Sequence, residues 1–314
     1  MKKFQFKKIL IIKHGSLGDV ISATSIIKAI NDKYNSADIS VLTSTSYSTF
    51  FSKINKNFNI YIDDRKGFFK TLKMLLFFNK KKFDLIIDLQ NSNRTFFYNI
   101  FFKFISKSII NSTHRFSDYR YKYSKLNPPA VIQGLVNQVK LINVEPNNKP
   151  YLNFLEKDLT RDFHFLDKLF FIIHPGCSIK NLHRKWSDEN YIEVCKHLLR
   201  KNVIPVITGA ETDRKSVEKI IKNVPESINL LNKSPLDVIY NLSIRACGAI
   251  SNDTGPAHLI ASTGCKIHLV LSSKSKANTQ IPQSNNVTFS QSDNHINDIK
   301  TEKVLIFIDK ILND

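Results

Sequence analysis

A chain of 314 residues is long enough for two domains of ordinary size, each with its own core. Its 42% hydrophobic and 23% charged residues are typical of a folded globular protein and exclude wholesale disorder. The formal charge of +19 favours anionic partners, such as a nucleotide, a phosphosugar, a nucleic acid or an acidic membrane leaflet.

The first half of the chain alternates short apolar runs with helical patterns. Strands are predicted at 9–12, 39–42 and 85–89, and a helix over 20–30 follows the first of them. This alternation indicates βαβ units and a parallel sheet. The run at 9–12 follows a basic start but is too short for a signal peptide, so we expect a cytoplasmic protein.

Two segments of the first half, 67–83 and 96–110, interleave Phe and Leu with Lys at helical spacing. This pattern suits a basic amphipathic surface lying on an anionic bilayer. Two core helices with a solvated lysine face explain it equally, and both interpretations stay open. The lysines interrupt every apolar stretch before it reaches the about 18 residues of a membrane span.

A segment rich in Pro and Asn, 143–151, predicts a linker with a domain boundary near residue 150. The strand and helix pattern then resumes, and the last segment, 302–312, predicts an amphipathic helix that can pack on either domain. We therefore expect two Rossmann-like domains, 1–150 and 151–314. The second contains predicted strands at 170–173, 203–208, 247–250 and 267–271, and helices at 189–200, 211–222 and after Thr254.

A glycine turn, KHGSLGD (13–19), follows the first predicted strand and opens a helix. Free backbone N–H groups and the helix dipole make such a turn an anion site. Asp19 ends the turn, where its carboxylate can act as a general base in a cleft. It can equally cap the helix without any chemistry.

The segment HPGCSIKNLHRKW (174–186) follows a predicted strand of the second half. It supplies a Pro-Gly turn and then three consecutive basic residues, His183, Arg184 and Lys185, before Trp186. Turn N–H groups and mobile cations suit a diphosphate. A solvated loop with Trp186 as a core anchor is the simpler alternative.

Two further turns of the second half carry acidic residues. Glu211 stands at the top of a predicted helix, where a carboxylate can bind both hydroxyls of a ribose or cap the helix. DTGPAH (253–258) combines Asp253, a hydroxyl, a glycine, a proline in the first helical turn and His258. Its N–H donors suit a leaving diphosphate, although His258 can also be a core residue.

Several function classes are disfavoured. The P-loop spacing and a strict GxGxxG are absent, which disfavours an ATPase and a dehydrogenase. No HExxH or suitably placed DxD indicates a divalent metal site, so we expect chemistry without a metal. The four cysteines show no CxxC pair, which predicts thiols in a reducing compartment.

Taken in order, GxLGDxI, HPG with a later KxW, GxxE and D[ST]GxxH resemble the motifs of glycosyltransferase family 9, the lipopolysaccharide heptosyltransferases. The resemblance covers nearly the whole chain. It implies an α/β GT-B fold, in which two Rossmann-like domains face a central cleft. The first would bind the acceptor and the second the nucleotide-sugar donor.

The resemblance also implies an activity and its partners. Heptose would pass from ADP-heptose, with inversion and without metal or cofactor, to a lipid-linked, phosphorylated glycan such as the lipopolysaccharide inner core. Such acceptors lie at the cytoplasmic face of the inner membrane, which would give the basic aromatic segments an anionic surface to contact.

Residue roles follow from the matching motifs. Asp19 would be the catalytic base, and Lys185 would neutralise the diphosphate. Glu211 would hold the ribose. The rest of the predicted donor set is His174, Gly176, Asp253, Thr254, Gly255 and His258, and the predicted acceptor set is Ser16, Gly18, Gln90 and Arg94. Within FDLIIDLQNSNR (83–94), Asn91 replaces the glycine usual in the family.

Three alternatives remain. The donor can carry another sugar or nucleotide, in a GT-B-type transferase or in a sugar-nucleotide epimerase. The chain can instead be a basic module that binds nucleic acid or a membrane surface. Binding to nucleic acid is not expected, because no motif that reads RNA or DNA is present and the lysines are scattered along the chain.

Overall fold

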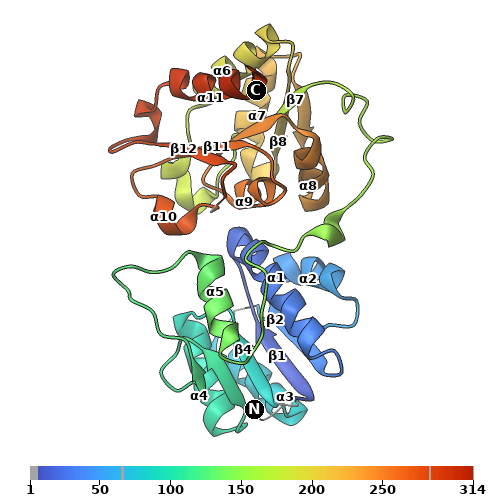
Figure 1. Ribbon diagram of the computed structural model, residues 1–314, viewed down its shortest axis with the longest axis vertical. Helices are drawn as coiled ribbons and strands as arrows, with labels where there is room; N and C mark the ends of the chain where they lie inside the picture. Colours follow the sequence, from blue (N-terminus) through green and yellow to red (C-terminus); the bar gives the residue numbers. More distant parts are fainter. Residues whose placement is uncertain (1–5, 65–66, 283, 314) are drawn as a thin grey trace. The chain divides into compact units, whose positions relative to one another are not determined.

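The computed structural model describes residues 6–64, 67–282 and 284–313. The chain divides into two compact units, unit 1 (Met1–Phe154) and unit 2 (Leu155–Asp314) (Figure 1). Each unit contains one six-stranded sheet whose described strand pairs are all parallel. The predicted α/β class with two parallel sheets is therefore confirmed.

Unit 1 has the strand order β3-β2-β1-β4-β5-β6. Its strands are β1 (Lys8–Ile12), β2 (Asp38–Thr43), β3 (Asn59–Ile62), β4 (Leu85–Asp88), β5 (Ile109–Ser112) and β6 (Tyr119–Arg120). Its α-helices are α1 (Leu17–Lys33), α2 (Ser48–Ile54), α3 (Phe68–Lys81), α4 (Asn93–Phe104) and α5 (Val131–Lys140). From β1 the chain adds β2 and β3 on one side, and it then returns to add β4, β5 and β6 on the other side. The carboxyl ends of β1 and β4 therefore form a topological switch point.

The central strands of unit 1 are continuous apolar runs because helices cover both faces of the sheet. Residues 9–12 of β1 are fully buried. Leu75 and Phe78 of α3 and Phe102 of α4 pack on one face, in a core cluster with Leu10 of β1. The segment 67–83 is thus a helix as predicted, whereas 96–110 ends its helix at Phe104 and then enters β5.

Unit 2 repeats the topology with the order β12-β11-β10-β7-β8-β9. Its strands are β7 (Phe170–His174), β8 (Ile204–Gly209), β9 (Ile228–Leu231), β10 (Gly248–Asn252), β11 (Ile267–Leu271) and β12 (Val287–Gln291). Its α-helices are α6 (Asp188–Arg200), α7 (Arg214–Asn223), α8 (Leu236–Arg245), α9 (Gly255–Ser262), α10 (Ala277–Gln280) and α11 (Thr301–Asn313). Here β7 and β10 form the switch point.

The terminal helix α11 packs against α6 in unit 2. His197 of α6 and Asp309 of α11 approach to 2.8 Å. Trp186 is fully buried in the same core, where its indole N–H donates to the carbonyl of Ile299 at 3.1 Å. Trp186 is thus a core anchor. None of the described helices combines the length and the apolar character needed to cross a membrane.

Candidate functional site

A pocket of about 270 Å³ opens in unit 1 at the carboxyl ends of β1 and β4. Ligands bind at this place in doubly wound sheets because the loops on either side of a switch point diverge. Asp19 and Gln90, two of the predicted site residues, line the pocket. Other lining residues are Lys13, Asn91, Thr113, Tyr121, Tyr123 and Gln138.

Asp19 caps its own helix and also lines the pocket. It is the third residue of α1, and its Oδ2 accepts from the backbone N of Ser16 at 3.1 Å and from its Oγ at 3.2 Å. No described residue donates a hydrogen bond to Oδ1. Capping therefore fixes one carboxylate oxygen, and Asp19 still borders the pocket. Ser16 itself is exposed, and Gly18 is buried in the first turn of α1.

Lys13 is a pocket residue that the sequence analysis passed over. Its side chain is buried, and its Nζ donates to the carbonyl of Leu89 at 3.1 Å. Burial lowers the pKa of Lys13, and the charges of Asp19 and Asp88 oppose this effect. The pocket lining thus contains a buried amino group close to the carboxylate of Asp19. The only sequence signal was a lysine at the end of an apolar strand.

Gln90 and Arg94 were predicted together but have separate environments. Gln90 Oε1 accepts from the backbone N of His14 at 3.0 Å and of Gly15 at 3.3 Å, so it supports the glycine turn. Arg94 is not among the pocket-lining residues. Its Nη2 lies 3.3 Å from Asp63 Oδ1 and 2.9 Å from Thr71 Oγ1, which ties it to α3 and to the segment that precedes α3.

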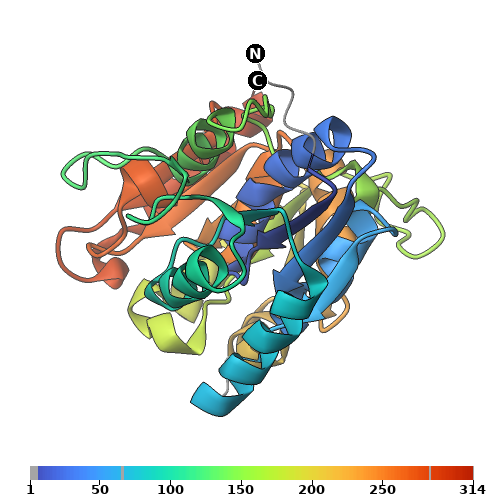
Figure 2. The same cartoon turned by 90° about the horizontal axis from the view of Figure 1, so that it is seen from below.

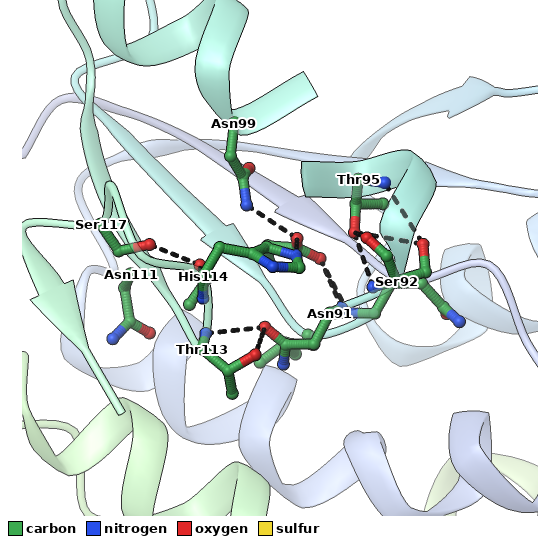
Figure 3. Close-up of polar contacts among 12 residues, drawn as sticks. Asn91, Ser92, Thr95, Asn99, Asn111, Thr113, His114 and Ser117 are labelled. Carbon is green, nitrogen blue, oxygen red and sulfur yellow. Dashed lines mark hydrogen bonds and ion pairs between the residues drawn. The ribbon is translucent and has the colours of Figure 1, made fainter. Parts of the chain in front are cut away.

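Asn91 explains how the chain dispenses with the usual glycine. Its φ of 49° is left-handed, a conformation that glycine adopts freely and asparagine tolerates. Its Oδ1 accepts from the N of Thr113 at 2.9 Å and from its Oγ1 at 3.1 Å (Figure 3). Its Nδ2 donates to Gln138 Oε1 at 2.8 Å. The left-handed turn is thus kept without glycine. The Asn91 side chain also connects Thr113 and Gln138, which line the same pocket.

A buried carboxylate, Asp88, organises the backbone beneath the pocket. Its Oδ1 accepts from the N of Gln90 at 3.0 Å and of Asn91 at 2.9 Å. Its Oδ2 accepts from Asn99 Nδ2 at 2.9 Å and lies 3.4 Å from His114 Nε2 (Figure 3). The turn after β4 is therefore held from below by charge-assisted hydrogen bonds.

In unit 2 three predicted segments meet where β7 and β10 end. The two strands are paired, with His174 opposite Ser251. Asn252 connects the segments, because its Nδ2 donates to the carbonyls of Pro175 at 2.9 Å and Gly176 at 3.2 Å. Its Oδ1 accepts from the N of Trp186 at 3.2 Å. One fully buried amide thus joins the HPG turn, the basic segment and the end of β10.

The HPG turn is tightly packed. His174 Nδ1 lies 3.0 Å from Thr208 Oγ1, and burial lowers the pKa of His174 while the charge of Asp213 opposes this. A Cβ on Gly176 would lie 2.5 Å from Asp213 Cγ. Only glycine fits there while that carboxylate accepts from the N of Ala210 at 2.9 Å.

The two cations before Trp186 have different partners. Arg184 Nη1 lies 2.9 Å from Oδ2 of the buried Asp253. Lys185 Nζ lies 3.2 Å from Asp188 Oδ1, in the first turn of α6. The structure thus connects Arg184, and not Lys185, to the DTG turn. The KxW motif could have identified Arg184, because Arg184 stands two residues before Trp186 and Lys185 stands only one residue before it.

Glu211 is exposed, and both of its carboxylate oxygens have partners. Arg214 donates to Oε1 at 2.7 Å and to Oε2 at 2.8 Å, and Asn232 Nδ2 donates to Oε2 at 2.6 Å. The hydrogen bonds from Arg214, and then that from Asn232, lower the pKa of Glu211 to about 2. The predicted ribose ligand is therefore fully ionised at neutral pH.

The DTG turn leads directly into α9. Thr254 is the residue before the helix, and its Oγ1 lies 3.3 Å from Ser251 Oγ. Gly255 begins α9 and a proline follows it. His258 lies half-buried in the first turn. No group of three or more His, Cys, Asp or Glu able to hold a metal occurs within 6–64, 67–282 and 284–313.

The family model of glycosyltransferase family 9 (heptosyltransferase) matches residues 73–305, which is well over half of the chain. No curated protein sequence matches. Solved structures are similar over almost the whole chain. The glycosyl transferase family 9 protein of Veillonella parvula DSM 2008 is 16% identical with a TM-score of 0.77, covering 98% of this chain and 97% of that one.

Two structures from E. coli give similar values. ADP-heptose lps heptosyltransferase II is 15% identical with a TM-score of 0.75, covering 97% of this chain and 98% of its own. Heptosyltransferase WaaC with ADP is 14% identical with a TM-score of 0.72, covering 97% and 99%. At these identities the likeness concerns the fold, and it confirms the predicted GT-B class.

Proposed function

The chain belongs to glycosyltransferase family 9, the heptosyltransferase family that its motifs predicted, and from this premise we propose the reaction that it catalyses. Heptose passes from ADP-heptose to a lipopolysaccharide inner-core or related glycan acceptor, with inversion and without a metal. The observation that carries this proposal is Asp19, which borders a switch-point pocket with one carboxylate oxygen held by its own helix cap.

Asp19 acts as the general base in this proposal. It takes the proton of the acceptor hydroxyl as that oxygen attacks the anomeric carbon. The bond from the anomeric carbon to the diphosphate breaks, and its electron pair leaves with the nucleotide. A single displacement of this kind inverts the anomeric centre. The amino group of Lys13 is buried near this carboxylate, whose charge opposes the lowering of the Lys13 pKa by burial.

Unit 2 binds the donor in this proposal. The leaving diphosphate gains negative charge, which N–H groups at the start of α9 and nearby cations stabilise. We add Arg184 to the predicted Lys185, because Asp253 directs its guanidinium toward the DTG turn. Glu211 accepts hydrogen bonds from the ribose hydroxyls. These hydroxyls then compete with Asn232 Nδ2 for Glu211 Oε2.

The remaining assignments follow the family premise. Unit 1 binds the acceptor, which is lipid-linked and phosphorylated, with Ser16, Gly18 and Gln90 near its hydroxyl. Arg94 acts on that side indirectly, by holding Asp63. The protein works in the cytoplasm at the inner face of the inner membrane.

Nucleotide-dependent melting of the purified chain tests the donor. ADP and ADP-heptose should raise the melting midpoint, and UDP, GDP and their sugars should not. Arg184→Gln should reduce the shift more than Lys185→Gln, which serves as the matched control on the adjacent cation. A shift confined to UDP or GDP compounds would keep the fold and overturn the heptose donor. No shift with any nucleotide would refute the transferase.

Transfer to a heptose-deficient core acceptor, followed by mass spectrometry, tests the base. Asp19→Asn keeps an oxygen for the cap at Ser16 but cannot take a proton. Turnover should fall by about 10²- to 10⁴-fold, while the ADP-dependent melting shift is unchanged. Conversion of the donor sugar in the absence of any acceptor would instead favour an epimerase.

A further inference from the structure

The outward faces of α3 and α4 expose large apolar side chains. On α3, Phe69 is 84% exposed and Leu76 is 48% exposed, and on α4, Phe97 is 67% and Phe104 is 59% exposed. Single exposed apolar residues are common, but a contiguous group of them marks an interaction site. A surface of this kind has a partner.

The two helices lie side by side on one face of the sheet. Phe78 of α3 and Phe102 of α4 approach beneath them, with ring centroids 6.3 Å apart, and α3 packs against α4. Figure 2 shows both helices together, α3 in cyan and α4 in teal. On α3 the exposed residues Phe69, Leu72, Leu76 and Lys80 are three or four positions apart, which places them on one side of the helix. On α4 the exposed Phe97 and Phe104 are seven positions apart, or about two turns, and so also share one side.

Lysines accompany the aromatic residues, and carboxylates do not. Neither the α3 sequence nor the α4 sequence contains an Asp or a Glu. We define the Phe-Lys face by its exposed members, which are Phe69, Leu72, Leu76, Phe97 and Phe104 with Lys70, Lys73, Lys80 and Lys81. Its charge is complementary to an anionic surface.

The composition distinguishes a lipid surface from a protein partner. Lysine is depleted in protein–protein interfaces, because burying its ammonium is costly. At a bilayer, its stem lies along the apolar layer while the ammonium stays among the anionic headgroups. Phenylalanine on the same helix enters the boundary of the acyl chains.

The Phe-Lys face continues toward the pocket of unit 1. Phe116, in the loop after β5, lies 5.8 Å from the ring of Phe104 and 6.1 Å from that of Phe96. The ring of Phe96 lies 5.2 Å from His114, whose neighbour Thr113 lines the pocket. A chain of aromatic contacts thus joins the exposed face to the pocket wall.

From these observations we propose that the Phe-Lys face docks unit 1 on an anionic lipid bilayer. The inference deepens the proposed function by naming the partner that would present a lipid-linked acceptor. Docking needs neither donor nor acceptor, so it is measured without them, and the nucleotide-dependent melting shift tests the transferase separately.

Co-sedimentation of the full chain with vesicles tests the proposal. Phosphatidylglycerol–phosphatidylcholine vesicles should bind the protein, phosphatidylcholine vesicles should not, and added salt should weaken binding. The double variant Lys73→Gln, Lys80→Gln should lose about fivefold in partitioning for each lysine. Phe69→Ser with Phe97→Ser should lose roughly tenfold for each phenylalanine.

Matched controls lie on α11 of unit 2. Ile306 is 68% exposed and Lys303 is exposed, so Ile306→Ser and Lys303→Gln remove the same kinds of side chain elsewhere. These variants should bind vesicles like the original chain, and circular dichroism should show every variant folded.

Equal loss in the α11 controls would overturn the proposal, and so would equal binding to neutral vesicles or no binding at all. A dimer in solution that Phe69→Ser dissociates, without vesicle binding, would assign the face to a second copy of the chain.

Discussion

Replacing Asn252 with alanine tests how the three donor-side segments are held together. The side chain of Asn252 is fully buried and makes hydrogen bonds to Trp186, Pro175 and Gly176 at 2.9 to 3.2 Å. Alanine removes all of them, because its methyl group neither donates nor accepts a hydrogen bond. The backbone N–H of Trp186 and the two carbonyls then lose these partners in the interior of unit 2.

The expected loss of stability is large. A buried polar group left without its partner costs about 1–3 kcal/mol, so the N–H of Trp186 and the carbonyl of Pro175 together cost roughly 2–6 kcal/mol. For a domain of this size each kcal/mol lowers the melting midpoint by about 2–4 °C. The midpoint of unit 2 should therefore fall by roughly 4–24 °C.

The assay uses the single tryptophan of the chain, Trp186, whose backbone is bonded to Asn252. Its fluorescence reports on unit 2 during thermal unfolding. Asn223→Ala, at the exposed end of α7, is the control and should change stability by no more than about 0.5 kcal/mol. An Asn252→Ala midpoint as close to the original as that of the control would refute the reasoning.

Three further changes have defined outcomes. Asn91→Ala should destabilise unit 1 by about 1–2 kcal/mol more than Asn91→Gly, because alanine cannot relieve the left-handed backbone, and equal circular-dichroism midpoints would contradict this. Arg214→Gln should raise the pKa of Glu211 from about 2 toward its ordinary 4.5. A depressed pKa keeps the carboxylate ionised as the pH falls, so calorimetric ADP titrations should lose affinity near pH 4.5 only in the variant. Gly176→Ala should cost about 1–3 kcal/mol in circular-dichroism melts, since its Cβ would meet a buried carboxyl carbon at 2.5 Å, whereas Gly134→Ala, in helix α5 of unit 1, should cost nothing.

The strands next to the site were readable from sequence because they are buried on both faces. β1, β4 and β7 are apolar except for one residue at an end, and β10 is apolar over its first three residues. Glycine or Pro-Gly turns follow several of these strands. Other strands gave no such signal. β3 and β12 are only partly buried and carry polar residues, and the two-residue β6 is too short for any periodicity.

Residues of the candidate site could be predicted only where they lie in a turn that the local sequence itself identifies. Asp19 and the DTG turn follow directly from the local order of a strand, a glycine turn and a helix start. Lys13, Arg184 and Asn252 could not be identified in this way. Each acts through a partner far away in the chain: Leu89, Asp253 and Trp186, respectively.

The sequence by itself determined the family, the two parallel sheets and the position of the candidate base, because these depend on local pattern and motif order. Tertiary structure alone decided which cation faces Asp253, because Arg184 and Lys185 are adjacent and chemically similar. It also decided that the aromatic residues of α3 and α4 divide between core and surface. Helical periodicity places apolar residues on both sides of each helix, and only the sheet determines which side is buried.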